Sequence, residues 1–143
     1  MQDIMHLIRI HASPERVYEA ITTADGIRRW WTRDVAIEPK VGAAGEFGFY
    51  GKRFVANVIV EVLSPVTDVR WKVTNSAWQG NDIEFGLKGD GNDTMLLFVH
   101  RGFPLADEKY AAATTRWGFY LLSLKRYLQD GKGTPNPDDG ELG

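Results

Sequence analysis

Cysteine is absent from the 143 residues of this chain. Its absence excludes a disulfide framework, a thiolate zinc site and a cysteine nucleophile. Clusters of Lys and Arg are also missing, since 17 basic residues are spread among 19 acidic ones and the formal net charge is −2. Proteins that bind nucleic acid usually carry a concentrated basic patch. We therefore expect no nucleic-acid partner.

Long apolar runs and a secretion signal are missing as well. No apolar run approaches the length of about 20 residues that a membrane-spanning helix needs. The chain passes directly from Met1-Gln2-Asp3 into a strand-like segment, without the charged and apolar regions of a signal peptide. These absences predict a protein without a membrane span, and we expect it in the cytoplasm.

Recognisable catalytic and metal-binding motifs are scarce. The three histidines, His6, His11 and His100, include no helical i, i+4 pair and no HExxH motif. The chain also lacks GxSxG, a phosphate-binding loop and GxGxxG. We therefore predict no metal site and no cofactor. His100 shares a strand face with Leu96 and Phe98, so it is the one candidate acid–base group; the alternative is a structural histidine bonded within the fold.

Aromatic residues are abundant by contrast, at 12% of the chain with five tryptophans. The clearest pattern is an apolar stripe that predicts one long amphipathic helix over residues 110–128. Gly131 and Pro135 follow it, as is typical of a helix end. The stripe consists of Tyr110, Ala113, Trp117, Tyr120, Leu121, Leu124, Tyr127 and Leu128.

Upstream of that helix, a two-residue alternation of apolar and polar side chains predicts the strands of an antiparallel sheet. The predicted strands are residues 4–11, 46–49, 54–62, 69–73, 82–88 and 94–101. Two short helices follow the first strand, the first beginning at Ser13-Pro14. The order predicts an α+β fold in which a curved sheet of about six strands wraps around the last helix. We expect a single domain over residues 1–131 and a disordered tail over residues 132–143.

Several segments of the chain resemble one known family. They are ASPERVYEAIT at residues 12–22, Trp30-Trp31, RWGFYLLSLKRYL at residues 116–128 and GKGTP at residues 131–135. On these residues the chain resembles the Hsp90-ATPase-activator-homologue family of the START/Bet v 1-like superfamily. The resemblance implies the helix-grip fold and a cavity between the sheet and the C-terminal helix.

The aromatic residues are predicted to surround that cavity, with His100 and Arg116 as its polar groups. The function that such a cavity predicts is the binding of a small apolar or aromatic ligand. The alternative is that the rings simply fill the core. The predicted cavity residues are Trp30, Trp31, Phe47, Phe49, Trp71, Trp78, Phe85, Phe98, His100, Arg116, Trp117, Tyr120, Leu121 and Leu124.

Three further roles remain open at the level of the sequence. The superfamily includes cyclases and hydrolases of polyketide-like compounds, and such an enzyme would need His100 as its base. The family resemblance also implies, as an alternative, a protein-binding, cochaperone-like module. Finally, Phe119 and Leu122 lie opposite the helix stripe, and Met95, Leu97 and Val99 share one strand face. Exposed apolar clusters of this kind favour a contact between chains, so we predict a homodimer.

Overall fold

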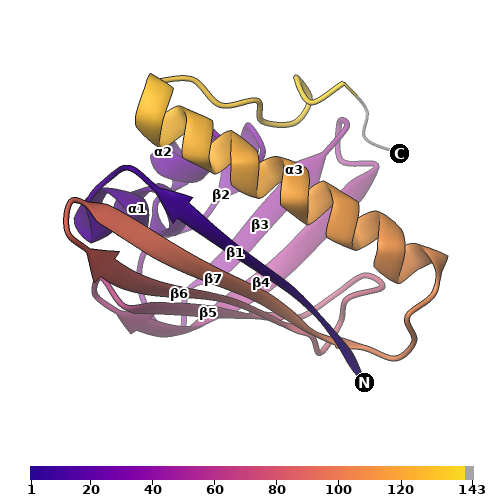
Figure 1. The fold of residues 1–143 in the computed structure, drawn as a ribbon. Coiled ribbons are helices and arrows are strands. Elements are labelled where there is room, and N and C mark those ends of the chain that lie inside the picture. Colours follow the sequence, from indigo (N-terminus) through magenta and orange to yellow (C-terminus); the bar gives the residue numbers. More distant parts are fainter. Residues whose placement is uncertain (141–143) are drawn as a thin grey trace.

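The protein is a curved sheet of seven antiparallel strands wrapped around one long helix, in a computed structural model that describes residues 1–140 (Figure 1). The strands are β1 (Gln2–Ile10), β2 (Asp34–Ala36), β3 (Ala44–Phe49), β4 (Phe54–Ser64), β5 (Asp68–Val73), β6 (Asp82–Asp90) and β7 (Asp93–Phe103). Their order in the sheet is β1-β7-β6-β5-β4-β3-β2. The predicted α+β helix-grip fold is confirmed. The additional strand is β2, which is too short to give an alternation in the sequence.

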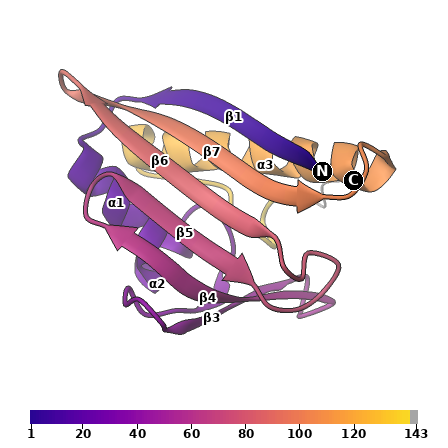
Figure 2. The same cartoon turned by 90° about the horizontal axis from the view of Figure 1, so that it is seen from below.

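Two short helices connect β1 to β2 and lie at one end of the sheet (Figure 2). The first, α1 (Pro14–Thr22), begins at Ser13, whose hydroxyl accepts a hydrogen bond from the backbone N–H of Arg16 at 3.3 Å. The second, α2 (Ala24–Ile27), is capped in the same way by Thr23. Each cap satisfies a backbone donor that the first helical turn leaves unpaired.

The long helix α3 (Glu108–Asp130) lies across the concave face of the sheet (Figure 1). Its first turn is capped by the Asp107 carboxylate, which accepts from the backbone N–H of Tyr110 at 3.1 Å. It ends at Gly131, whose φ of 89° is a left-handed conformation that favours glycine. The predicted stripe faces the sheet, because Ala113, Trp117, Tyr120, Leu121, Leu124 and Leu128 are all buried.

Interlocked aromatic rings fill the middle of the space between α3 and the sheet. The ring centroids of Phe98 and Trp117 lie 4.3 Å apart, and those of Trp31 and Trp117 lie 4.9 Å apart. The Trp31 ring also packs on Phe47 at 4.5 Å. The rings that are at most 2% exposed are Trp30, Trp31, Phe47, Trp71, Phe85, Phe98 and Trp117. Core filling is thus the role of this central group.

The C-terminal segment corrects one prediction. Residues 132–140 do not form a disordered tail but pack against the body of the protein, with Asn136 and Asp139 buried. The Asn136 backbone N–H donates to the Trp31 carbonyl at 2.8 Å, and the Thr134 N–H donates to the Ser123 hydroxyl at 2.7 Å. The polar composition suggested disorder, yet these polar groups are paired with α3 and with the loop after α2. Residues 141–143 of the predicted tail lie outside the described residues.

The convex face of the sheet exposes a group of apolar side chains on β1 and β7. Leu7 stands opposite Leu97 in the antiparallel register, and these residues are 63% and 40% exposed. Met5 is 60% exposed and stands opposite Val99, which is itself buried. The prediction that Val99 is exposed is therefore wrong, because Val99 stands between Met5 and Glu84, whereas the β6 partner of Leu97 is a glycine.

None of the helices in the described part of the chain combines the length and the apolar character needed to cross a membrane.

Candidate ligand-binding cleft

A cleft of about 520 Å³ opens at the N-terminal end of α3. It lies between the first half of that helix, the turn that joins β3 to β4 and the loop that joins β5 to β6. Its lining residues are Trp31, Phe49, Tyr50, Phe54, Ala77, Trp78, Glu108, Lys109, Ala112, Ala113, Arg116, Trp117 and Tyr120. The cleft is therefore continuous with the aromatic core at its base and with charged side chains at its rim.

The walls of the cleft are mainly aromatic. Trp31 and Trp117 are buried and form its base, while Phe54 and Trp78 are half-buried and form its outer wall. Trp78 packs edge-on against Phe54 at 5.2 Å and stacks on Trp117 at 6.4 Å between ring centroids. Rings held in this way by their neighbours offer flat apolar surfaces of fixed orientation to a guest molecule.

One side of the cleft ends in a buried polar cluster. The Asp139 carboxylate accepts hydrogen bonds from the Tyr120 hydroxyl, from the Tyr50 hydroxyl at 3.1 Å and from the Asn136 amide at 2.9 Å. Burial, together with the bond to Asp139, raises the pKa of Tyr120, so its phenol stays protonated at neutral pH. The cluster thus supplies fixed polar groups beside apolar walls, and it anchors the C-terminal segment.

The rim of the cleft carries three charged side chains from the first turns of α3. Glu108 and Lys109 are exposed, and Arg116 is partly exposed two turns further along. The positions Ala112, Arg116 and Tyr120 follow each other at four-residue spacing, so they lie along one side of the helix. Arg116 is therefore placed to contact an anionic or polar end of a molecule that lies against the aromatic walls.

The predicted cavity residues divide into two groups. Those that line the cleft are Trp31, Phe49, Trp78, Arg116, Trp117 and Tyr120. Those that lie elsewhere are Trp30, Phe47, Trp71, Phe85, Phe98, His100, Leu121 and Leu124, all of them buried in the core. The division arises because strand and helix patterns identify the inward face correctly but do not show where along that face the packing leaves room.

His100 lies behind the cleft rather than in it. Its Nδ1 accepts from the Trp117 indole N–H at 3.1 Å, and its Nε2 faces the Asn81 amide at 3.1 Å. Burial lowers the pKa of His100 to about 4, against the opposing effect of the Asp3 charge. His100 is therefore a neutral structural histidine at ordinary pH. The cyclase-like or hydrolase-like alternative relied on this residue as a base within the cavity, and the geometry does not support that role.

Several lining residues were missed at the level of the sequence. Tyr50 and Phe54 flank the β3–β4 turn, where alternation ends, and Tyr50 adopts a positive φ of 52°. Asp139 does not line the cleft but bonds to two residues that do, and it was missed because it lies in the segment predicted to be disordered. The position of Ala112 in the cleft could have been predicted, because Ala112 precedes Arg116 by four residues on the side of the helix next to the aromatic stripe.

Metal coordination finds no obvious place among residues 1–140, where no three His, Asp or Glu side chains are grouped closely enough to hold an ion.

Comparison with known proteins identifies relatives of this architecture. The family model described as Activator of Hsp90 ATPase homolog 1-like protein matches residues 11–129. The solution structure of the Aha1 dimer from Colwellia psychrerythraea is 37% identical in sequence, with a TM-score of 0.86. That match covers 93% of this chain and 100% of the Colwellia chain.

More distant structures share the fold alone. Protein SSP2350 from Staphylococcus saprophyticus is 18% identical with a TM-score of 0.78, over 92% of this chain and 95% of its own. The protein CalU16 from Micromonospora echinospora is 17% identical with a TM-score of 0.72, over 90% of this chain and 77% of its own. No curated protein sequence matches the chain.

Proposed function

Because the chain belongs to the Activator of Hsp90 ATPase homolog 1-like protein family, and has its helix-grip fold, we propose that it binds a small apolar or aromatic ligand in the cleft at the N-terminal end of α3. The observation that carries the proposal is the cleft itself. Its volume of about 520 Å³ falls in the range of small-molecule sites, and aromatic rings form most of its walls.

The composition of the cleft favours a ligand that is flat and mostly apolar, with a polar group at one end. A ligand that removes about 300 Å² of apolar surface from water gains about 7.5 kcal/mol at about 25 cal/mol per Å². Loss of translational and rotational freedom offsets part of this gain. The Arg116 side chain at the rim, and the hydroxyls of Tyr50 and Tyr120 at the inner end, provide the polar contacts that would orient the molecule.

The test uses N-phenyl-1-naphthylamine, a neutral aromatic probe whose fluorescence rises in apolar surroundings. We expect saturable binding with a dissociation constant of tens to hundreds of micromolar, roughly −5 to −6 kcal/mol. The variant Ala112→Phe places a ring in the cleft and should weaken binding at least about tenfold. Its matched control, Ala111→Phe, adds the same ring on the exposed side of α3 and should leave binding unchanged. Equal effects of the two variants, or no saturable binding, would contradict the proposal.

Self-association through the convex face of the sheet is a second proposal, and the exposure of Met5, Leu7 and Leu97 supports it. The Colwellia relative, a dimer, adds to this argument because it is 37% identical. Burying three exposed apolar side chains between two copies would remove them from water.

Light scattering on Leu7→Glu and Leu122→Glu tests the proposed face. Both are exposed leucines, but Leu122 lies on α3 and Leu7 on β1. We expect a wild-type dimer that Leu7→Glu dissociates and Leu122→Glu does not. The opposite pattern would place the interface on the helix, and a monomeric wild type at high concentration would remove the proposal altogether.

A further inference from the structure

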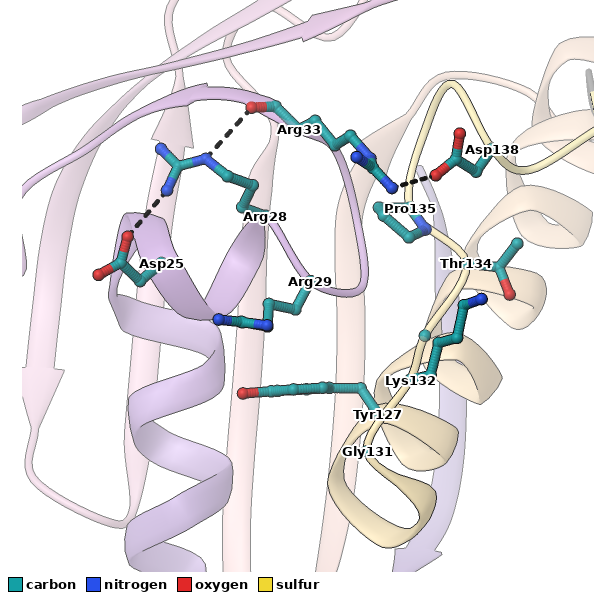
Figure 3. A pocket seen from close by; sticks show the side chains of 11 residues that line it. Asp25, Arg28, Arg29, Arg33, Tyr127, Gly131, Lys132, Thr134, Pro135 and Asp138 are labelled. Atoms are coloured by element: carbon teal, nitrogen blue, oxygen red, sulfur yellow. Dashed lines mark hydrogen bonds and ion pairs between the residues drawn. The ribbon is translucent and has the colours of Figure 1, made fainter.

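A second pocket, of about 780 Å³, lies at the opposite end of α3 and has a different chemical character. Arg28, Arg29 and Arg33 line it from the segment that follows α2, and Tyr127 lines it from the last turns of α3 (Figure 3). Residues 131–135 and Asp138 complete it from the C-terminal segment. The pocket is therefore built from two parts of the chain, residues 25–33 and residues 127–138, that are distant in sequence.

The pocket concentrates positive charge in a protein of net charge −2. Four cationic side chains and two carboxylates line it, which leaves a local charge of +2. Arg28 pairs with Asp25 at 2.8 Å, and Arg33 pairs with Asp138. Arg29 and Lys132 make no side-chain hydrogen bond or ion pair with any of residues 1–140. Two cations thus line one pocket, and neither is paired with a carboxylate of the described part of the chain.

The backbone holds the two segments that carry these cations close together. A Cβ on Gly133 would lie 2.5 Å from the carbonyl oxygen of Arg29, so only glycine permits this close approach of the C-terminal segment. The Arg33 backbone N–H donates to the Asn136 carbonyl at 3.0 Å, which ties the same two segments together. The arrangement is therefore built into the fold and does not depend on flexible side chains alone.

We propose that this pocket binds the phosphate or polyphosphate group of a small anion. The planar guanidinium of Arg29 matches phosphate oxygens in a bidentate manner, and Lys132 adds a second positive charge at the same pocket. The Arg28–Asp25 pair is exposed, with the Asp25 side chain 94% accessible. Exposed ion pairs of this kind are weak, so a dianion can recruit Arg28 as a third cation.

The pocket also has a less polar side that suits a phosphate carried on an organic group. The Tyr127 ring and Pro135 line it together with the cations. Figure 3 shows the Arg29 and Tyr127 side chains extending in the same direction from different elements. A phosphate bound by Arg29 would therefore lie next to a phenol hydroxyl and an aromatic face.

Calorimetric titration with pyrophosphate tests the proposal. We expect saturable binding that Arg29→Gln and Lys132→Gln each weaken by about tenfold, because each removes a charge-assisted contact. Asp25→Asn frees Arg28 and should tighten binding several-fold. Such a gain cannot come from damage to the fold. Lys88→Gln, which changes an exposed lysine of β6 outside the pocket, is the matched control and should have no effect.

Two further arms complete the experiment. One arm is co-sedimentation with phosphatidylcholine vesicles, with and without phosphatidic acid. Co-sedimentation that needs phosphatidic acid and that Arg29→Gln abolishes would identify the ligand as a lipid headgroup. Binding of pyrophosphate without co-sedimentation would identify it as a free phosphate compound. All four variants should retain N-phenyl-1-naphthylamine binding, which separates this site from the aromatic cleft. The proposal is overturned if neither phosphate probe binds saturably, or if Lys88→Gln weakens binding as much as Arg29→Gln.

Discussion

The two ends of α3 carry pockets of opposite construction. At the N-terminal end, packed aromatic rings such as Trp31 and Trp117 form the base of the cleft, and charge is confined to its rim. At the C-terminal end, exposed cations such as Arg29 and Lys132 form the pocket, and the backbone of residues 131–135 sets its shape. One helix therefore borders a site formed mainly by packed aromatic rings and a site formed mainly by charged side chains.

This difference determines how each pocket should respond to change. Residues that form the base of the cleft also belong to the core, so altering them changes stability and binding together. Residues of the basic pocket are mostly exposed, and altering them should change binding while stability stays nearly constant. For the same reason, we expect ligand binding to respond differently to salt in the two pockets, and we expect protein stability to depend on pH through the residues behind the cleft.

The largest effect is expected for Trp31→Ala. The Trp31 ring contacts those of Phe47, Phe49, Trp71 and Trp117 and is 2% exposed. Its removal leaves a cavity in the core and should lower the free energy of unfolding by about 4 kcal/mol, measured by urea denaturation. Arg29→Gln is the comparison from the other end of α3 and should change it by less than about 0.5 kcal/mol. Similar losses in the two variants would break the contrast between the pockets.

The next effect concerns pH and His100, which supports the cleft from behind. Its pKa is about 4 in the folded protein and about 6.5 in the unfolded chain, so the unfolded state binds more protons between these values. The contribution of neutral His100 is therefore complete above about pH 6.5 and is lost as the pH falls toward 4.

That loss corresponds to about 3 kcal/mol, to the precision of such linkage arguments. His100→Gln cannot gain a proton, so its free energy of unfolding should fall less steeply between pH 7 and pH 4 than that of the wild type. Urea denaturation at a series of pH values provides the measurement. Parallel pH profiles for the two proteins would show that His100 is not held neutral by burial.

Tyr120→Phe tests the connection between the two pockets. The variant removes one donor to the buried Asp139 carboxylate and should cost about 2 kcal/mol. Because Asp139 anchors the C-terminal segment that lines the basic pocket, pyrophosphate binding should weaken as well. Tyr18→Phe is the control, since the Tyr18 hydroxyl makes no hydrogen bond within residues 1–140. If hydrogen exchange finds residues 132–140 equally protected in Tyr120→Phe and wild type, the anchoring role is wrong.

The smallest effect is a difference in salt dependence. Raising NaCl from about 0.05 M to about 0.5 M should weaken pyrophosphate binding by about tenfold, because salt screens exposed charges. Binding of N-phenyl-1-naphthylamine in the cleft should change by less than about twofold, since it depends on apolar burial. Titrations of the same protein sample at both salt concentrations make the comparison, and equal salt dependence would show that the pockets are not of different kinds.

The sequence was sufficient for the fold because its patterns are periodic. The stripe from Ala113 to Leu128 identified the buried face of α3, and the alternation around Phe98 identified the inward face of β7. Periodicity reports which way a side chain points, and that is what a layered fold requires.

The sites were only partly predictable for the same reason. Whether an inward ring such as Trp71 fills the core or, like Trp78, lines a cleft depends on packing at the scale of single atoms. The role of Asp139 depends on hydrogen bonds to Tyr50 and Tyr120, which are distant in sequence. The basic pocket could not be predicted from the sequence, because the segments that carry Arg29 and Lys132 meet only where Gly133 approaches the backbone of Arg29. No local pattern in the chain records these contacts.

The most direct test of the central claim, that the cleft is a ligand site, is a ¹H–¹⁵N correlation NMR titration of the wild-type protein with N-phenyl-1-naphthylamine. The account predicts saturable shifts at the Ala77, Ala112 and Arg116 amides and at the Trp78 indole N–H, with the Arg29 and Lys132 amides unmoved. Saturable shifts confined to the convex face or to the basic pocket, with the cleft resonances unchanged at saturation, would contradict it.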